Sequence, residues 1–293
     1  MTRVCVVGSV NLDLTADVDT LPRPGTTVLA SALTYAPGGK GANQAVAAAR
    51  AGAQVQFVGA LGDDAAAEQL RAHLLSNGVG LAGTVTVPGP SGTAIVVVDA
   101  DAENTIVVAP GANGQLSLTA ADMPAVIAEC DVLLTQLEIP VAAAVSAARE
   151  ARSGGAVVMV NASPAGQDSR ALAELAAVAD VVVANEAEAG EWPWRTSYFV
   201  TTLGARGARC VSPDDEFWVP APTVKAVDTS GAGDVFAGVL AANWPPNPGS
   251  RAERLAALQR ACAAGALATL VSGAGDSAPD AAAIDAAMST STR

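Results

Sequence analysis

Residues 132–160 read VLLTQLEIPVAAAVSAAREARSGGAVVMV and contain one complete unit of the fold. An apolar run at 132–136 is followed by an alanine-rich segment at 141–152 and by a second apolar run at 156–160. Gly154 follows the expected helix, where a left-handed C-terminal cap favours glycine. Two apolar strands joined by a helix are typical of a right-handed βαβ unit with parallel, buried strands.

The same alternation continues on both sides of this unit. Further strands are expected at 4–7, 55–59, 181–184 and 198–202, and further helices at 43–51, 65–76 and 170–178. Gly52 and Gly78 follow two of these helices as C-terminal caps. The pattern predicts an α/β fold with a central, mostly parallel sheet and helices on both faces, in a single domain over residues 1–293.

Two regions interrupt this rhythm. Residues 12–35 suggest short alternating strands around a PRPG turn, and residues 93–109 suggest a hairpin with polar residues at its tip. Neither is connected by crossover helices, so we expect a small β-rich lid formed by about 12–36 and 92–110. Its apolar positions need a cover, which favours a homodimer through the lids; these positions are Leu12, Leu14, Val28, Ile95 and Val97.

The composition excludes several classes of protein. Among 293 residues, 51% are hydrophobic, which excludes an intrinsically disordered chain. Lys+Arg 16 against Asp+Glu 29 gives a net charge of −13, which argues against nucleic acid or an anionic membrane as partner. His73 is the single histidine, so the chain lacks the residues for a Ser-His-Asp triad or a multi-histidine metal site.

The compartment is also suggested by the sequence. The four cysteines are far apart in apolar stretches, as expected for buried thiols in a reducing compartment. No signal-like segment is visible at the N-terminus, and no apolar run approaches the roughly 20 residues of a membrane helix. We therefore expect a soluble, cytoplasmic protein.

The segment DTSGAGD at 228–234 carries the strongest chemical signal. It lies between an expected strand at 223–227 and a helix at 235–243. Gly231 and Gly233 permit a tight turn whose backbone N–H groups, at a helix N-terminus, can hold an anion. Asp234 beside that anion suits a carboxylate that takes a proton from a hydroxyl attacking a bound phosphoryl group. A plain helix N-cap after a glycine turn is the simpler alternative.

The segment PGGKGANQ at 37–44 is a second glycine-rich turn. It is not a Walker loop, because Gly41 follows Lys40 where serine or threonine is required. The glycines let the backbone approach a ligand, and Lys40, Asn43 and Gln44 offer donors suited to a polyhydroxylated molecule. The alternative is a strand-to-helix turn capped by Asn43.

The segment GSVNLD at 8–13 ends the first strand, at the sheet edge where open parallel sheets bind ligands. Asn11 and Asp13 alternate along the chain and therefore point to the same side, where they can bind vicinal hydroxyls. An Asx-type turn into the lid is the alternative.

Taken in order, these segments resemble the ribokinase branch of the PfkB carbohydrate kinase family, over nearly the whole chain. The resemblance is carried by GSVNLD, GGKGANQA, QLEIP at 136–140, NASP at 161–164, NEAE at 185–188, TLGARG at 202–207 and DTSGAGD. It implies ATP-dependent phosphorylation of D-ribose at its 5-hydroxyl, giving ribose 5-phosphate and ADP. A related kinase for another sugar or a nucleoside, and a sugar-binding protein with a weakened nucleotide site, are the alternatives.

The resemblance also implies roles for individual residues. Asp234 is the expected general base, with an anion hole formed by the N–H groups of Gly231, Ala232, Gly233 and Asp234. The expected sugar ligands are Asn11, Asp13, Gly39, Lys40, Gly41, Asn43 and Glu138. The expected nucleotide contacts are Asn185, Thr202, Leu203, Gly204, Ala205, Arg206, Gly207, Gly233 and Cys262. Glu188 is expected to act on Mg²⁺ through water, and a monovalent cation, normally K⁺, is expected at Asp228, Ser230, Ala268, Val271, Gly273 and Ser277.

One segment departs from the family pattern. After NEAE the family has a helix, a variable stretch and a second helix, whereas here only AGEWPWRTS at 189–197 precedes the next strand. A βα crossover needs at least about ten residues. We therefore expect either that strand 198–202 pairs differently or that part of one sheet face lacks a helix. Trp192 and Trp194 would then cover that face.

Overall fold

The computed structural model describes residues 1–101, 103–118, 123–246 and 249–290. The strands are β1 (Arg3–Val7), β2 (Asn11–Asp17), β3 (Ala32–Gly38), β4 (Gln54–Leu61), β5 (Val79–Thr86), β6 (Gly92–Val98), β7 (Asn104–Ala109), β8 (Val132–Thr135), β9 (Val157–Asn161), β10 (Val181–Asn185), β11 (Tyr198–Thr202), β12 (Ala208–Val211) and β13 (Glu216–Val219). The helices are α1 (Lys40–Arg50), α2 (Ala65–Ser76), α3 (Met123–Ala128), α4 (Val141–Ser153), α5 (Ser169–Ala176), α6 (Glu186–Gly190), α7 (Ala232–Asn243), α8 (Arg251–Ala268) and α9 (Ala281–Thr290), with short 3₁₀ turns η1 (Gly111–Gln115) and η2 (Gly204–Arg206).

The large sheet has the strand order β13-β12-β11-β10-β9-β8-β1-β4-β5. All pairs from β5 to β11 are parallel, and β12 and β13 add an antiparallel hairpin at one edge. The unit β8–α4–β9, quoted at the start, lies in the middle of this sheet with Val132 beside Val157. The predicted fold class is thus confirmed.

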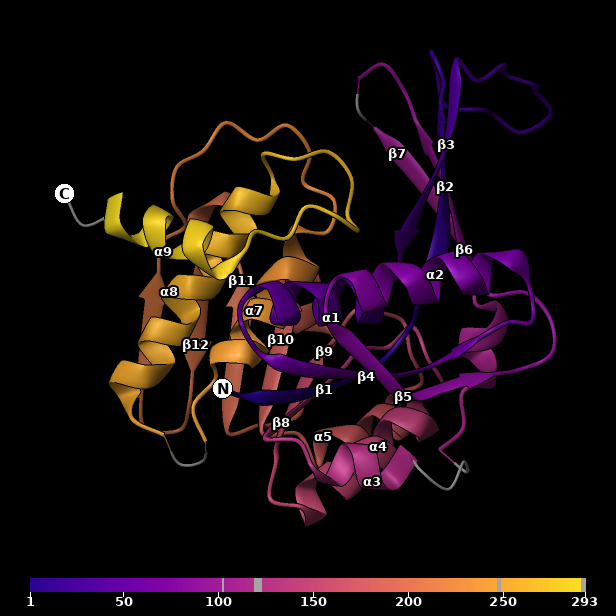
Figure 1. Cartoon of the computed structure of the whole chain (residues 1–293). Coiled ribbons are helices and arrows are strands. Elements are labelled where there is room, and N and C mark those ends of the chain that lie inside the picture. Colours follow the sequence, from indigo (N-terminus) through magenta and orange to yellow (C-terminus); the bar gives the residue numbers. More distant parts are fainter. Residues whose placement is uncertain (102, 119–122, 247–248, 291–293) are drawn as a thin grey trace.

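Each face of the large sheet has its own apolar layer. Val4 and Val6 of β1 belong to one layer, which α1, α2, α7 and α8 cover. Cys5 and Val7 belong to the other, which α3, α4 and α5 cover, as Figure 1 shows. Alternate residues of a strand point to opposite faces, so a strand that is apolar throughout contributes to both layers.

A second sheet has the strand order β3-β2-β6-β7 and projects away from the large one (Figure 1). It is called the small sheet below. The hairpin β6–β7 forms as the sequence predicts, except that Ala102 at its turn lies outside the described residues. Strand β2 pairs with both β3 and β6, so two segments far apart in the sequence form one sheet.

Two local predictions are wrong. Residues 223–227 form no strand; instead the N–H groups of Val227 and Asp228 donate to the carbonyl of Thr269, which ties this segment to the end of α8. Gly154 is not the left-handed cap, because its N–H still bonds back to Glu150 with φ −79°, and Gly155 adopts φ 86° instead.

The short connection between β10 and β11 is accommodated without a change of pairing. Strand β11 runs parallel to β10, with Val181 beside Tyr198. Trp192 is 6% exposed and belongs to the same apolar layer as α4 and α5, and its ring meets Trp194 edge-on with centroids 5.3 Å apart. The two tryptophans therefore pack on this face of the sheet, in the layer that α4 and α5 also cover.

Other polar residues near helices and turns have structural roles. Asp64 caps α2 by accepting from the N–H of Ala67, and Asp214 and Asp215 lie in the turn of the β12–β13 hairpin. His73 is partly exposed on α2.

Within the described residues, none of the helices combines the length and the apolar character required to cross a bilayer.

Candidate active site

The three sequence motifs meet at the carboxyl edge of the large sheet. GSVNLD continues β1 into β2, PGGKGANQ leads from β3 into α1, and DTSGAGD leads into α7. Helices α1 and α7 pack side by side, and Asn43 and Gln44 of α1 both donate to the carboxylate of Asp234 on α7. Residues separated by 191 positions in the sequence thus share one site.

Asp234 lies in the first turn of α7 and is 8% exposed. The N-cap of α7 is Gly231, at φ 73°, and no side chain caps the helix. The N-terminal N–H groups of α7 are therefore not claimed by a capping side chain, and the interpretation of Asp234 as the cap is wrong. Gly231 is required for packing as well, because a Cβ there would lie 2.8 Å from Ala274.

Asn11 and Asp13 project from β2 on the same side. Asn11 is 2% exposed, and its Oδ1 accepts from Asn113 Nδ2 at 2.8 Å, which leaves its own amide N–H groups for a ligand. Asp13 Oδ1 is buried without a hydrogen-bond partner. Burial raises the pKa of Asp13 to about 7, and the negative charges of Glu138 and Asp234 act in the same direction. A buried carboxyl with an unpaired oxygen is suited to accept from a ligand hydroxyl.

Lys40 is the cation among these carboxylates. The charge of Asp234 raises the pKa of Lys40 above its ordinary value, against the opposing effect of burial, and Glu138 and Glu188 contribute in the same direction. Glu138 Oε2 accepts from Ser9 Oγ at 2.6 Å and from the Lys40 N–H at 3.3 Å. The site therefore combines one lysine with a group of acidic side chains.

The glycines of PGGKGANQ are required by the close approach of two backbone segments. A Cβ on Gly39, which has φ 90°, would lie 2.7 Å from the backbone nitrogen of Asn11. A Cβ on Gly41 would lie 2.7 Å from the backbone nitrogen of Ser9. The loop is thus shaped by its contact with GSVNLD, in addition to any ligand.

Two residues of this site are not among the ligands expected from the sequence. Ser9 is fully buried and links Glu138 to Gly41, whose N–H lies 3.4 Å from Ser9 Oγ. Asn113 lies in η1 and is 1% exposed. Besides its bond to Asn11, its Oδ1 accepts from the N–H of Val10 and its Nδ2 donates to the carbonyl of Val10. Ser9 lies inside a quoted motif, whereas Asn113 follows the small sheet, where no motif directed attention to it.

The expected nucleotide residues follow the ends of β10 and β11. Asn185 and Glu188 form a capping box on α6, with each backbone N–H donating to the other side chain at 2.9 Å. The loop 202–207 lies beside them because β10 and β11 are paired, and it contains η2. Cys262 is only 4% exposed, with its Sγ 3.8 Å from the carbonyl of Val219, so its side chain lies in the core behind this loop.

The residues expected at a monovalent cation form a second cluster beside α7. Asp228 accepts from the N–H groups of Ser230 and Gly273, both at 2.8 Å. Burial alone would raise the pKa of Asp228, but these bonds lower it below its ordinary value. Ala268 ends α8, Val271 is 47% exposed, and Ser277 is 3% exposed with its Oγ on the Ala274 carbonyl.

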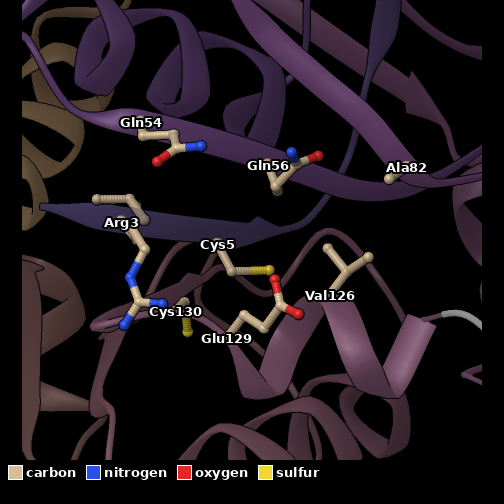
Figure 2. A pocket seen from close by; sticks show the side chains of 9 residues that line it. Arg3, Cys5, Gln54, Gln56, Ala82, Val126, Glu129 and Cys130 are labelled. Atoms are coloured by element: carbon tan, nitrogen blue, oxygen red, sulfur yellow. The ribbon is translucent and has the colours of Figure 1, made fainter.

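Within the described ranges, no three His, Cys, Asp or Glu side chains converge as a metal site would require. Each of the two expected cation places contains one carboxylate, that of Glu188 at one and that of Asp228 at the other. The opposite edge of the sheet has a different character: a cavity of about 180 Å³ lies at the amino ends of β1 and β4, lined by Arg3, Cys5, Gln56 and Cys130 among others (Figure 2). None of the expected site residues lies there.

Known proteins are similar to this chain in both sequence and fold. A family model described as "pfkB family carbohydrate kinase" matches residues 1–281. The ribokinase of Bacillus subtilis is 36% identical over 251 residues, covering 80% of this chain and 83% of that protein. The deoxyribokinase of Salmonella typhimurium is 34% identical over 263 residues, covering 81% and 84%. The bifunctional ribokinase/ribose-5-phosphate isomerase A of Fructilactobacillus sanfranciscensis is 34% identical over 265 residues, and the alignment covers 82% of this chain but only 48% of that protein.

Two solved structures extend the comparison to the whole chain. The ribokinase of Thermotoga maritima superimposes with a TM-score of 0.87 at 30% identity, covering 99% of this chain and 100% of that one. The ribokinase of Arabidopsis thaliana, complexed with ribose and ATP, superimposes with a TM-score of 0.86 at 28% identity, covering 98% of each chain. Together with the family match, these likenesses show that the chain belongs to the pfkB family of carbohydrate kinases.

Proposed function

We propose that the protein phosphorylates D-ribose at its 5-hydroxyl with ATP, giving ribose 5-phosphate and ADP. The observation that carries this proposal is the position of Asp234. Its carboxylate lies at the open N-terminus of α7, is held by Asn43 and Gln44, and is close enough to Lys40 to raise the pKa of that lysine. A general base and an anion-binding helix N-terminus are therefore adjacent, as transfer of a phosphoryl group to a hydroxyl requires.

The sugar is proposed to bind between the small sheet and α1. Asn11 presents amide donors and Asp13 an unpaired oxygen from neighbouring alternate positions of β2, which suits two vicinal hydroxyls. The remaining proposed contacts come from the α1 loop and from the loop after β8; they are Gly39, Lys40, Gly41, Asn43 and Glu138. Because the chain is also similar to a deoxyribokinase, 2-deoxyribose is the second acceptor to test.

In the proposed reaction, Asp234 accepts the proton of the 5-hydroxyl as the new O–P bond forms and the bond to ADP breaks. The N–H groups of Gly231, Ala232, Gly233 and Asp234 stabilise the charge of the transferring group, together with the helix dipole of α7. A primary alcohol is a weak acid, so the base acts while the bond is forming and need not generate a free alkoxide.

The nucleotide is proposed to lie along the ends of β10 and β11. Its proposed contacts are Asn185, Thr202, Leu203, Gly204, Ala205, Arg206, Gly207, Gly233 and Cys262. Of these, Cys262 contributes at most the edge of a buried side chain, because it is 4% exposed. The glycines of this loop include Gly207, whose φ of 99° and close approach to the Val219 carbonyl admit no side chain.

Two cations are proposed as partners of the reaction. One carboxylate fits Mg²⁺, which commonly uses one or two carboxylates besides waters and phosphates, and Glu188 supplies it through water. Mg²⁺ would neutralise charge on the phosphates. Asp228, Ser230, Ala268, Val271, Gly273 and Ser277 would hold K⁺ beside α7, mostly through hydroxyl and carbonyl oxygens. The low pKa of Asp228 keeps one formal negative charge there.

A homodimer through the small sheet is also proposed, with the chain acting as one domain whose small sheet serves as the lid. Tyr35, Leu14, Ile95 and Val107 lie directly opposite one another across all four strands and form one apolar row. Their face is opposite to that of Asn11 and Asp13, because successive residues alternate. Tyr35, Ile95 and Val107 are 55%, 46% and 59% exposed, so a second copy has a surface to bury.

The compartment is proposed to be the cytoplasm. Cys5, Cys130, Cys210 and Cys262 are all buried free thiols, as is typical of a reducing environment.

An acceptor panel tests the proposed function. ADP release is measured with ATP, Mg²⁺ and each of D-ribose, 2-deoxy-D-ribose, hexoses and nucleosides, and the ribose product is identified by ³¹P and ¹³C NMR. The proposal expects D-ribose to have the highest kcat/KM and to yield the 5-phosphate. A marked preference for another acceptor would identify that acceptor as the substrate in place of D-ribose. Ribose binding without ATP binding, measured by calorimetry, would favour a non-catalytic sugar-binding protein.

A further inference from the structure

Two glutamines, Gln44 and Gln136, are joined end to end behind Asp234. Both are 0% exposed. Gln136 Nε2 donates to Gln44 Oε1 at 2.6 Å, and Gln44 Nε2 donates to Asp234 Oδ1 at 2.9 Å. Burying an amide is unfavourable unless its hydrogen bonds are made, so this chain of amides needs an explanation beyond packing.

The direction of every bond in the chain is set by one backbone carbonyl. Asn161 Nδ2 donates to the carbonyl of Val183 at 3.1 Å, and a carbonyl can only accept. The Oδ1 of Asn161 therefore faces Gln44 and accepts from its Nε2 at 3.0 Å. With both N–H groups of Gln44 used, by Asn161 and Asp234, its oxygen must accept, and Gln136 is the donor that it meets.

Gln136 is held at its other end by packing rather than by a hydrogen bond. Its Oε1 is buried without a hydrogen-bond partner among the described residues. A Cβ on Gly8 would lie 1.9 Å from that oxygen, so the glycine leaves the space that the amide occupies. Unsatisfied buried acceptors are uncommon, and they are tolerated where a side chain has a role that outweighs the loss.

We propose that Gln44 and Gln136 are positioning residues for the proton transfer: Gln136 fixes the amide of Gln44, and Gln44 holds Oδ1 of Asp234 so that Oδ2 is presented to the acceptor hydroxyl. The other hydrogen bond to the carboxylate supports these different roles of Oδ1 and Oδ2. Asn43 Nδ2 donates to Oδ2 at 3.3 Å, a longer distance than that to Oδ1, so a ligand hydroxyl can replace this weaker bond. Neither glutamine is exposed to a ligand, so both act through Asp234. The inference rests on the proposed role of Asp234 as general base.

The test uses Gln44→Met and Gln136→Met, which keep similar volume and remove the donors. With D-ribose, or whichever acceptor the wild-type enzyme turns over fastest, Gln44→Met lowers kcat about 10- to 100-fold, because a hydrogen bond to a charged group is lost. Gln136→Met lowers kcat less, and KM for the acceptor changes little in both. Gln69→Met, on the exposed side of α2, is the matched control and leaves kcat unchanged.

The double variant separates positioning from general destabilisation. Because Gln136 acts through Gln44, Gln136→Met causes no further loss of kcat once Gln44→Met is present. Full kcat in folded Gln44→Met, or an independent loss from Gln136→Met in the double variant, would overturn the inference.

The position of the carboxylate is a second readout that does not depend on activity. In crystal structures of Gln44→Met and Gln136→Met, the proposal expects the Asp234 carboxylate to be rotated or disordered relative to the wild-type protein. An unmoved carboxylate in both variants would overturn the inference. Failure of the wild-type enzyme to phosphorylate ribose would instead count against the proposed function.

Discussion

At the scale of single residues, the carboxylate of Asp234 is defined by what surrounds it. It receives two hydrogen bonds from α1, and its charge raises the pKa of Lys40 in the glycine-rich loop. These contacts hold the carboxylate in place at the N-terminus of α7. A charge held there by specific donors fits a base better than a cap.

Replacing Asp234 by asparagine keeps the size of the side chain and removes the base. We expect kcat for phosphoryl transfer to fall about 10²- to 10⁴-fold, the usual contribution of general acid–base catalysis. Sugar binding should persist, because Asn11, Asp13 and Glu138 are unchanged. Coupled ADP release gives the rate and calorimetry the affinity. A variant within threefold of wild-type kcat would contradict the role of Asp234.

Asp13 makes a prediction about pH and stability. Its pKa is about 7 in the folded chain, against about 4 for an ordinary aspartate, so between these values the folded state binds the extra proton. The free energy of unfolding contributed by Asp13 therefore decreases as the pH rises from about 4 to 7, and the loss is complete above that range.

The variant Asp13→Asn has no such group to ionise. Its melting temperature relative to wild type should rise with pH from about 4 to 7 and then level off. Asp17→Asn, on the exposed end of the same strand, is the matched control, without this trend. A difference between Asp13→Asn and wild type that is equal at pH 5 and pH 8 would exclude a raised pKa.

The sequence predicts the position of a residue where that position follows from a local pattern, such as the alternation of a strand or the start of a helix. Asn11 and Asp13 share one side because a strand alternates, and Asp234 lies at a helix N-terminus because glycines precede an apolar helical run. Gln44 was expected to face a ligand, but it turns to Asp234 and Gln136. That direction depends on residues 190 and 92 positions away, which no local pattern reveals.

At the scale of elements, the alternation of strand and helix was sufficient to predict the large sheet. It was insufficient for residues 223–227, which are apolar enough for a strand but instead bind the end of α8. Likewise Asn113 of η1 donates to Asn11 at the start of β2, 102 positions away. Both contacts join residues that are far apart in the sequence, and such tertiary contacts override the secondary structure that a local segment prefers.

The β10–β11 connection yields a prediction about stability. Trp192 lies in this short connection, is 6% exposed and belongs to the apolar layer of α4 and α5. Trp192→Ala should lower the free energy of unfolding by about 3–5 kcal/mol, as for other large buried aromatic residues. Trp218→Ala, at 55% exposure and with one hydrogen bond to Arg206, is the control and should lose only about 1 kcal/mol. Equal losses of the free energy of unfolding in the two variants, measured by urea titration, would contradict the role of Trp192 in the core.

At the scale of the whole molecule, the net charge of −13 opposes the approach of ATP. The described site offsets that repulsion locally, with Lys40, the N-terminus of α7 and the proposed cations. Rising ionic strength should weaken the repulsion, since charges more than about 10 Å apart are screened at 0.1 M salt.

The apolar row of the small sheet predicts the oligomeric state. Val107→Asp places a charge in the apolar row of the proposed interface, on the edge strand β7, and should convert the dimer to a monomer, because an unpaired buried charge is unfavourable. Light scattering coupled to gel filtration measures the mass. Leu75→Asp, on α2 with a similar exposure of 59%, should leave the dimer intact. A wild-type monomer, or a dimer in Val107→Asp, would rule out this interface.

The central claim is that Asp234, Lys40 and the start of α7 form a sugar kinase site. The most direct measurement is coupled ADP release with ATP and Mg²⁺, with and without D-ribose, in K⁺ and in its absence. We predict ADP formation that requires D-ribose and increases with K⁺. The absence of ribose-dependent ADP formation with any nucleoside triphosphate would contradict the claim.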